Sequence, residues 1–307
     1  MRISQFFQLV FAAVIAGGLM QAGSIIYVAQ VTGIGNSTVG EYDATTGATI
    51  NANFITGLNF PTALALSGNA LFVTNQVAGT VGEYNATTGA AINANLITGL
   101  NSPEGLAFLG NNLFVTNYGG NTIGEYNATT GAAINLSFIT GLNQPEEMLL
   151  MGNDLFVAND GNNTVGEYDA TTGATINASF ITGLNFPIGL ALSGNILFVG
   201  NSGGTVGEYN ATTGAAINAS FVTGVNANYL ALLGNNLFES NYGPGTVGEY
   251  NATTGATIST SFITVTGDAA GLALSTSSVP EPSTWSITAL GGVVLLGTML
   301  WKKRQSA

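Results

Sequence analysis

The chain has 307 residues, of which 46% are hydrophobic and 7% are charged, with 43 glycines, no cysteine and no histidine. The missing cysteines exclude disulfides, thiolate metal centres and a lipoprotein anchor, and the missing histidines remove the most frequent general base and transition-metal ligand. The net charge is −12, and the four basic residues all lie at the two ends. A middle region without cations excludes nucleic-acid binding and leaves divalent cations, neutral glycans and basic proteins as candidate partners.

The N-terminal segment predicts export. Arg2 precedes an apolar run from Phe6 to Leu19, and the small residues Ala22 and Gly23 follow. This order is typical of a secretory signal peptide, which we assign to residues 1–23. A buried first helix is the alternative, but the apolar run carries no polar face and therefore fits export better.

One sequence unit is repeated through the rest of the chain. The dipeptide Glu-Tyr recurs at spacings of 41 or 42 residues, and a period of this length indicates a solenoid, propeller or array. The six copies are Glu41-Tyr42, Glu83-Tyr84, Glu125-Tyr126, Glu167-Tyr168, Glu208-Tyr209 and Glu249-Tyr250.

Each unit predicts four short strands separated by Gly/Asn turns. In the third unit the expected strands are Glu104–Phe108, Asn112–Thr116, Thr122–Asn127 and Ala132–Thr140. Short β-rich runs with such turns favour an antiparallel sheet, and four strands per unit are typical of a propeller blade. The fold class is therefore all-β.

The number of strands predicts six blades closed by both ends of the domain. Six first strands and six second strands can be counted, but the chain begins with a second strand, Ile25–Ala29, and ends with a first strand, Ala270–Leu274. These two ends would complete one blade and remove the open edge of the ring. We therefore predict a six-bladed β-propeller over residues 24–279.

The repeat resembles the NHL repeat. The resemblance lies in Pro103-Glu104-Gly105-Leu106-Ala107, in Gly110-Asn111-Asn112-Leu113-Phe114-Val115-Thr116-Asn117, and in Asn121-Thr122-Ile123 with Tyr126-Asn127. It implies a six-bladed propeller, as in the similarly built gluconolactonase-type and virginiamycin-lyase-type proteins. This chain lacks the basic residues common in the third strand of NHL repeats, and it lacks the histidine associated with the lyase chemistry.

The units differ mainly at one face of the predicted ring. The turn after the third strand is Asp/Asn-Ala-Thr-Thr-Gly in every unit, whereas the fourth-to-first and second-to-third connections vary. Loops held by a rigid scaffold often carry function, so this variable face is the candidate ligand-binding face; neutral drift is the alternative. Its aromatic residues would either stack on sugars or cover the blade cores: Phe60, Tyr118, Phe186, Tyr229 and Tyr242.

The same face carries a candidate metal site. Glu104 and Glu146 occupy equivalent positions in adjacent units, and Asn228 occupies that position in a third unit. Carboxylate and amide oxygens are ligands for Ca²⁺, and the gluconolactonase-type resemblance implies a divalent metal in a comparable place. The alternative is that these carboxylates are solvated at the rim.

The C-terminal end resembles the PEP-CTERM sorting signal of Gram-negative bacteria. Pro280-Glu281-Pro282 is followed by an apolar run, residues 285–301, and by Lys302-Lys303-Arg304. The resemblance implies processing by an exosortase, often in organisms that make extracellular polysaccharide. We predict a transmembrane helix over residues 285–301 within a sorting segment at 280–307. An ordinary membrane anchor is the alternative.

Three functions follow from these features. The first is an exported, non-catalytic scaffold or binding module of the cell surface or extracellular matrix, in contact with polysaccharide or another surface protein. The second is a metal-dependent, gluconolactonase-like enzyme that uses Glu104, Glu146 and Asn228. The third is a structural filler without a specific ligand.

Overall fold

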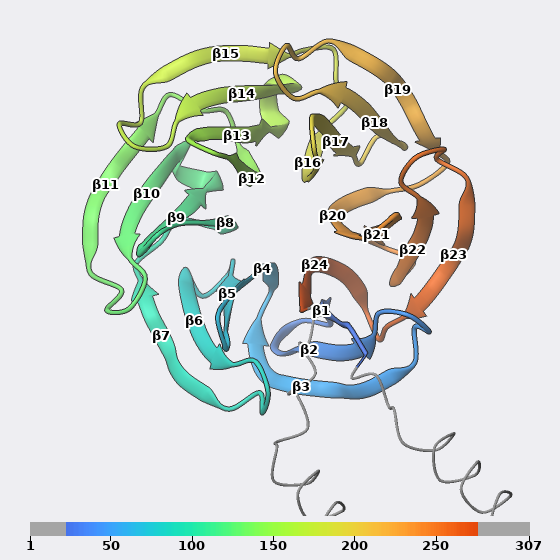
Figure 1. Ribbon diagram of the computed structural model, residues 1–307. Helices are drawn as coiled ribbons and strands as arrows, with labels where there is room; N and C mark the ends of the chain where they lie inside the picture. Colours follow the sequence, from blue (N-terminus) through green and yellow to red (C-terminus); the bar gives the residue numbers. More distant parts are fainter. Residues whose placement is uncertain (1–22, 276–307) are drawn as a thin grey trace, which may run out of the picture. The chain divides into compact units, whose positions relative to one another are not determined.

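The computed structural model describes residues 23–275, and Ser24–Ser275 form one compact unit. Six four-stranded antiparallel sheets stand around a central channel, each with its first strand innermost and its fourth strand outermost (Figure 1). The predicted all-β, six-bladed propeller is confirmed.

The strand bounds follow the repeat. Blade 1 contains β24 (Asp268–Ser275), β1 (Ile25–Val31), β2 (Ile34–Asp43) and β3 (Thr49–Asn59). Blade 2 contains β4 (Pro61–Ser67), β5 (Ala70–Asn75), β6 (Thr80–Asn85) and β7 (Ala91–Thr98). Blade 3 contains β8 (Pro103–Leu109), β9 (Asn112–Asn117), the 3₁₀ turn η1 (Tyr118–Gly120), β10 (Thr122–Asn127) and β11 (Ala133–Thr140).

The second half of the ring repeats this order. Blade 4 contains β12 (Pro145–Met151), β13 (Asp154–Asn159), η2 (Asp160–Asn162), β14 (Thr164–Asp169) and β15 (Thr175–Ile181). Blade 5 contains β16 (Pro187–Ser193), β17 (Ile196–Asn201), β18 (Thr205–Asn210) and β19 (Ala216–Thr223). Blade 6 contains β20 (Ala227–Leu233), β21 (Asn236–Asn241), β22 (Thr246–Asn251) and β23 (Thr257–Thr264).

Blade 1 closes the ring with strands from both ends of the unit. β1 pairs with β2 on one side and with β24 on the other, so that Tyr27 lies between Glu41 and Ala273. The predicted closure is confirmed. It leaves no blade short of a strand, which removes an open edge that would invite pairing with another chain.

The repeated Gly-Glu-Tyr sequence has a packing reason. The tyrosine ring lies over the glycine two residues before it on the same strand, and a Cβ at Gly124 would be 2.7 Å from Cε2 of Tyr126. The same contact occurs at Gly40, Gly82, Gly166, Gly207 and Gly248. The intervening glutamate faces the other side; Glu125, for example, accepts a 2.6 Å hydrogen bond from Nδ2 of Asn112.

The uniform turn after the third strand joins neighbouring blades. Asn127 Oδ1 accepts hydrogen bonds from the N–H groups of Thr129 and Thr130, at 3.1 and 2.9 Å. Gly131 has φ +69°, and a Cβ on it would lie 1.9 Å from the carbonyl oxygen of Leu96 in blade 2. The corresponding glycine approaches the previous blade in the same way all around the ring, so this position requires glycine for both conformation and space.

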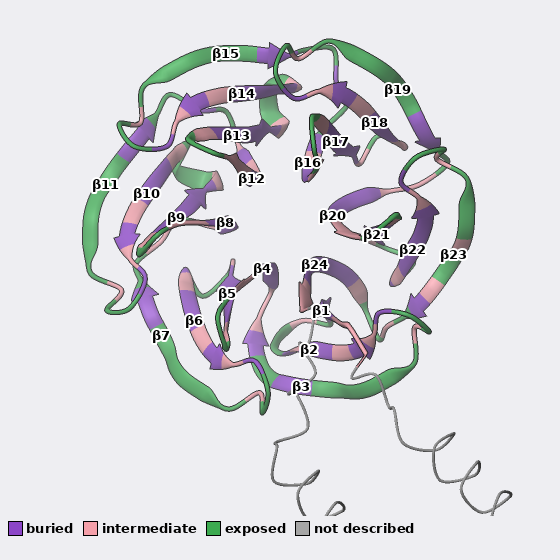
Figure 2. Ribbon diagram, in the orientation of Figure 1, coloured by how far each residue is buried: buried purple, intermediate pink, exposed green. Residues whose placement is uncertain are grey.

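The core fills the spaces between blades. Residues of the second and third strands are largely buried, whereas the first half of each outermost strand is exposed (Figure 2). Second-strand aromatic rings pack on fourth-strand rings of the same blade, as Phe114 does on Phe138 at 4.9 Å between centroids. In blade 2 the fourth strand has Leu96 instead, and Phe72 pairs with Phe108 of blade 3.

The two terminal predictions lie outside the described residues. The signal peptide at 1–23 falls there except for Gly23, and so do the sorting segment at 280–307 and the helix predicted at 285–301. Within residues 23–275, no helix is long and apolar enough to cross a membrane.

Blade 6 carries one carboxyl in the interblade core. Glu239 has no exposed surface and stands where the other blades have valine, as at Val115 and Val199. Its Oε2 accepts a 2.7 Å hydrogen bond from Asn241, but its Oε1 has no partner among the described residues. Burial raises the pKa of Glu239 to about 8.

The contact between the tyrosine ring and the glycine predicts that a larger residue at the glycine position destabilises the fold. Gly124→Ala should lower the free energy of unfolding by about 1–3 kcal/mol because its methyl group overlaps the Tyr126 ring. Gly120→Ala is the matched control, since its Cβ would meet its nearest neighbours at 3.4 Å. Chemical denaturation compares the two, and equal stabilities would contradict this packing.

Glu239 predicts a pH-dependent gain in stability. Glu239→Val should stabilise the protein by about 2–4 kcal/mol at pH 8. The gain in stability grows as the pH rises from the ordinary glutamate pKa of 4.5 to the folded value of about 8. Between these pH values Glu239 is ionised in the unfolded chain and protonated in the folded protein. Thermal melts of both proteins from pH 4 to 9 measure it. A gain that is the same at every pH would show that Glu239 titrates normally.

Candidate functional site

A cavity of about 230 Å³ lies at the channel mouth on the variable face. Its walls include one residue from the same repeat position in every blade: Thr62, Glu104, Glu146, Ile188, Asn228 and Ala270. Phe60, Gln76, Tyr229, Tyr242 and Val31 complete the lining. Because the six first strands converge on the axis, positions 41 or 42 residues apart meet at one place.

This repeat position is among the most varied parts of a nearly uniform chain. The turn after the third strand keeps the same residue types in six copies, whereas the six channel positions hold five different residue types. The cavity therefore combines carboxyls from the adjacent blades 3 and 4 with an amide from blade 6 and with apolar side chains from blades 5 and 1, namely Ile188, Ala270 and Val31.

Glu104 is a buried carboxyl inside the cavity wall, with 4% of its surface exposed. Its Oε1 accepts a hydrogen bond from Nε2 of Gln76. Burial raises the pKa of Glu104, and the hydrogen bonds from Gln76 and Thr62 offset only part of this effect. No cationic side chain is present in residues 23–275 to stabilise the ionised form.

Glu146 lines the same wall in the next blade. Burial is the largest cause of its raised pKa, and the carboxylates of Glu104, Asp160 and Glu147 add to it. No hydrogen bond to its carboxyl is found within the described chain. The alternative that these carboxylates are solvated at the rim is therefore wrong for Glu104, which the converging strands bury. It holds only in part for Glu146, whose side chain is half-buried.

Asn228 places an amide in the cavity without satisfying it. Only 7% of its surface is exposed, and its side chain has no hydrogen-bond partner within residues 23–275. Glu239 Oε1 is the one buried side-chain atom without a partner in the described chain, so the Asn228 amide is still accessible from the cavity and is available to a ligand.

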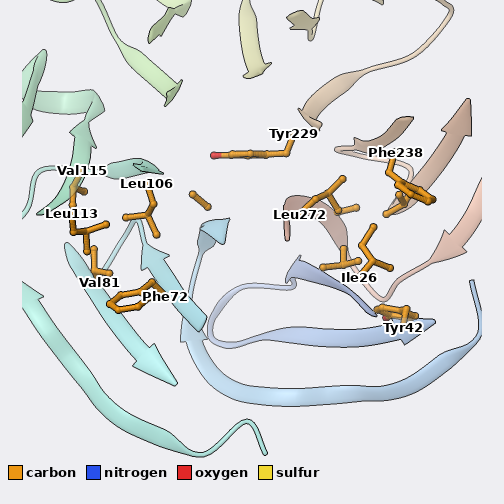
Figure 3. Packing of buried hydrophobic residues seen from close by; sticks show 14 of the residues in the cluster. Ile26, Tyr42, Phe72, Val81, Leu106, Leu113, Val115, Tyr229, Phe238 and Leu272 are labelled. Atoms are coloured by element: carbon orange, nitrogen blue, oxygen red, sulfur yellow. The ribbon is translucent and has the colours of Figure 1, made fainter. Parts of the chain in front are cut away.

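Tyr229 separates the two ends of the channel. It extends from β20 across the ring, and its hydroxyl points toward the side of β8 and Leu106 (Figure 3). The hydroxyl donates a 3.3 Å hydrogen bond to the backbone carbonyl of Glu104 in blade 3. The equivalent position holds glycine or alanine in four of the other blades, so only Tyr229 is long enough to form this floor.

Two of the remaining aromatic candidates line the cavity and two do not. Phe60 and Tyr242 are half-buried at its walls. Phe186 is 51% exposed and Tyr118 is half-buried, and both lie outside the lining. Phe60 and Phe186 precede prolines and have φ of +58° and +54°, a conformation that costs energy for such residues and holds the variable loops in fixed positions.

A second cavity of about 480 Å³ opens at the opposite end of the channel. Leucine and alanine side chains from blades 2 to 6 dominate its lining, and Glu147 is its one carboxyl. Glu147 Oε2 accepts a 2.6 Å hydrogen bond from the Leu190 N–H, and burial raises its pKa to about 8. Glu147 therefore belongs to this cavity and not to the channel mouth.

The donor set at the mouth is compatible with a hard cation. Within residues 23–275, no group of three or more Asp, Glu, His or Cys residues could hold a metal. The predicted Glu104, Glu146 and Asn228 supply two carboxyls and one amide oxygen around the same cavity. Calcium accepts 6–8 oxygen ligands, so a ligand or water would have to supply the rest.

Sequence reasoning missed several lining residues. Thr62 and Ile188 begin first strands just as Glu104 does, so the repeat alignment could have identified them. Gln76 lies in a variable loop, and no sequence pattern indicates its hydrogen bond to Glu104.

Glu104 predicts a pH-dependent effect on stability. Glu104→Gln should stabilise the unliganded protein by about 1–3 kcal/mol at pH 8 and by much less at pH 5. The raised pKa means that the folded state resists ionisation as the pH rises above the ordinary value, and glutamine removes this cost. Glu125→Gln, in the third strand of the same blade, is the control. Equal gains at both pH values would contradict the burial of an ionisable carboxyl.

The sequence matches the family model of the PEP-CTERM protein-sorting motif over residues 278–305. No curated protein matches the chain. Because the family match covers only the motif, the NHL-type assignment of the repeats stays a prediction.

Solved structures share the fold. A chain from a nidogen/laminin complex is 15% identical, with a TM-score of 0.66, and the match covers 84% of this chain and 100% of that chain. A gluconolactonase from Xanthomonas campestris is 17% identical, with a TM-score of 0.59, and the match covers 70% of this chain and 79% of that chain. At these identities the likeness shows the fold alone. The chain is a six-bladed β-propeller that carries a PEP-CTERM sorting motif, which marks it as an exported protein that an exosortase processes and sorts to the cell envelope of a Gram-negative bacterium.

Proposed function

We propose that this protein is a non-catalytic binding module of the cell surface or extracellular matrix, and that its ligand site is the channel-mouth cavity. The sorting motif supports the location. The closed ring of near-identical blades supplies a rigid scaffold, and the variable loops of one face surround the cavity.

One observation supports binding over a purely structural role. The one repeat position that contributes a residue from all six described blades to this cavity is also among the positions at which the blades differ most. A filler without a ligand would gain nothing from the buried carboxyl of Glu104, because burying an ionisable group lowers stability.

Extracellular polysaccharide is the partner that fits this site best. The cavity combines the aromatic residues Phe60 and Tyr242 with the hydrogen-bonding groups of Thr62, Gln76 and Asn228. Sugar rings present apolar faces edged by hydroxyls and so match such a lining. Ca²⁺ held by Glu104, Glu146 and Asn228 would supply further contacts to hydroxyl groups.

A metal-dependent lactonase is the second candidate. Glu146 favours it, since a carboxyl with a raised pKa beside a cavity is suited to general base catalysis near neutral pH. The gluconolactonase among the similar folds is compatible with this role. Against it stand the missing histidines, the absence of lysine from residues 23–275 and the small donor set at the mouth.

Cosedimentation of the purified full-length chain with insoluble or aggregated polysaccharides tests the proposal. We expect a neutral or amino polysaccharide to pellet the protein, and we expect acidic ones to fail because both partners are anionic. Parallel samples with calcium and with EDTA show whether a metal takes part. Failure of every polysaccharide to pellet the protein would contradict the proposed function.

The lactonase alternative makes a separate prediction. If Glu146 is a general base, Glu146→Gln should lower lactone hydrolysis by about 10²–10⁴-fold. We expect the wild-type protein to show no hydrolysis of aldonolactones above the buffer rate, as a pH-stat assay with added calcium can measure. A measurable rate that falls in Glu146→Gln would establish the enzyme and overturn the non-catalytic proposal.

A further inference from the structure

The channel mouth holds two carboxyls without any internal cation to pair with them. Glu104 and Glu146 line one wall, and every Lys and Arg of the chain lies outside residues 23–275. The other 13 carboxylates of that region add to a field of one sign, which attracts cationic ligands and repels anions.

The cavity also contains polar side chains that have no hydrogen-bond partner in the described chain. Glu146 and Asn228 have no side-chain hydrogen bond within the described chain, and Asn228 is more than nine-tenths buried. A ligand that only neutralises charge would leave the Asn228 amide unsatisfied. A ligand with both a cationic group and hydroxyls would satisfy it.

The remaining walls set the size and shape of the ligand. A volume of about 230 Å³ lies below the 300–1,000 Å³ typical of drug-sized ligands and suits a group the size of one sugar ring. Phe60, Tyr242 and Ile188 supply apolar surface to the same cavity. Tyr229 lines the cavity as well, and its hydroxyl donates a hydrogen bond to the Glu104 carbonyl across the ring.

We propose that this cavity binds a protonated amino sugar, whose ammonium group lies between the carboxyls of Glu104 and Glu146. The natural ligand is a polysaccharide that carries free amino groups. Thr62, Gln76 and Asn228 contact its hydroxyls, and Phe60 and Tyr242 pack against the ring. The proposal rests on the proposed binding function and names its ligand class.

The ammonium group explains why the carboxyls are tolerated. Burial raises the pKa values of these two neighbouring carboxyls, so ionising them costs free energy. A bound cation lowers this cost because it favours the ionised forms. A lysine side chain of a basic protein offers the same group, but its linear stem would leave the Asn228 amide and the aromatic walls without contacts. The sugar ring therefore fits more of the cavity.

Titration calorimetry of the purified full-length chain tests the ligand class at pH 7 in EDTA. The probes are oligomers of glucosamine with free amino groups, their N-acetylated counterparts, and glucose oligomers of equal length, which replace the ammonium by a hydroxyl. We expect the free-amine oligomers to bind about 10–100-fold more tightly than either neutral set, since a charged hydrogen bond stabilises more than a neutral one.

A matched pair of variants assigns the effect to the cavity. Glu104→Gln with Glu146→Gln should remove the preference for the free amine. Glu125→Gln with Glu167→Gln makes the same charge change on third strands of the same two blades and should retain it. Thermal melts confirm that both variants fold.

The other outcomes are distinguishable. Equal binding of all three oligomers would overturn the ammonium site and leave the polysaccharide-binding function standing. Binding of a lysine-rich peptide but of no sugar would overturn the amino-sugar ligand in favour of a basic protein. Binding that requires calcium would show that the carboxyls hold a metal. No binding of any probe, together with no cosedimentation, would remove both proposals.

Discussion

The lack of any cationic side chain between residues 23 and 275 is the constraint on which the rest depends. Carboxyls in this propeller can be stabilised only by solvent, by hydrogen-bond donors or by an external cation. The turn aspartates use backbone and threonine donors, as Asp43 does with Thr45 and Thr46. The Glu-Tyr glutamates use solvent or asparagine. Glu104 and Glu239 are both buried with few donors, but only Glu104, together with Glu146, lines a cavity that an external cation can enter.

Near-identity of the blades makes the exceptions informative. Gly131 and its counterparts repeat because each turn contacts the neighbouring blade, so a change at one would disturb the ring. The channel positions are free of that contact and can differ. Glu147 and Tyr229 occupy a position that is small in the other blades, and each lines a different one of the two channel cavities.

Much of this architecture could be predicted because it is local. Four strands per unit, the Asn-Ala-Thr-Thr-Gly turn and the entry at Ile25 follow from patterns within about 42 residues. The burial of Glu104 and the reach of Tyr229 to the Glu104 carbonyl depend on how six strands converge, 125 residues apart in the latter case, and no local pattern encodes them. The burial of Glu239 likewise depends on the packing of neighbouring blades, although its hydrogen-bond partner Asn241 lies two residues away on the same strand.

The titration of Glu104 tests the central claim most directly. Carbon-13 NMR of labelled glutamate carboxyls, assigned with Glu104→Gln, gives its pKa with and without glucosamine oligomers. The uncompensated site predicts a pKa well above the ordinary 4.5 in the free protein and a fall toward it when the amine binds. A pKa near 4.5 in the free protein would show that Glu104 is adequately solvated and would contradict the account.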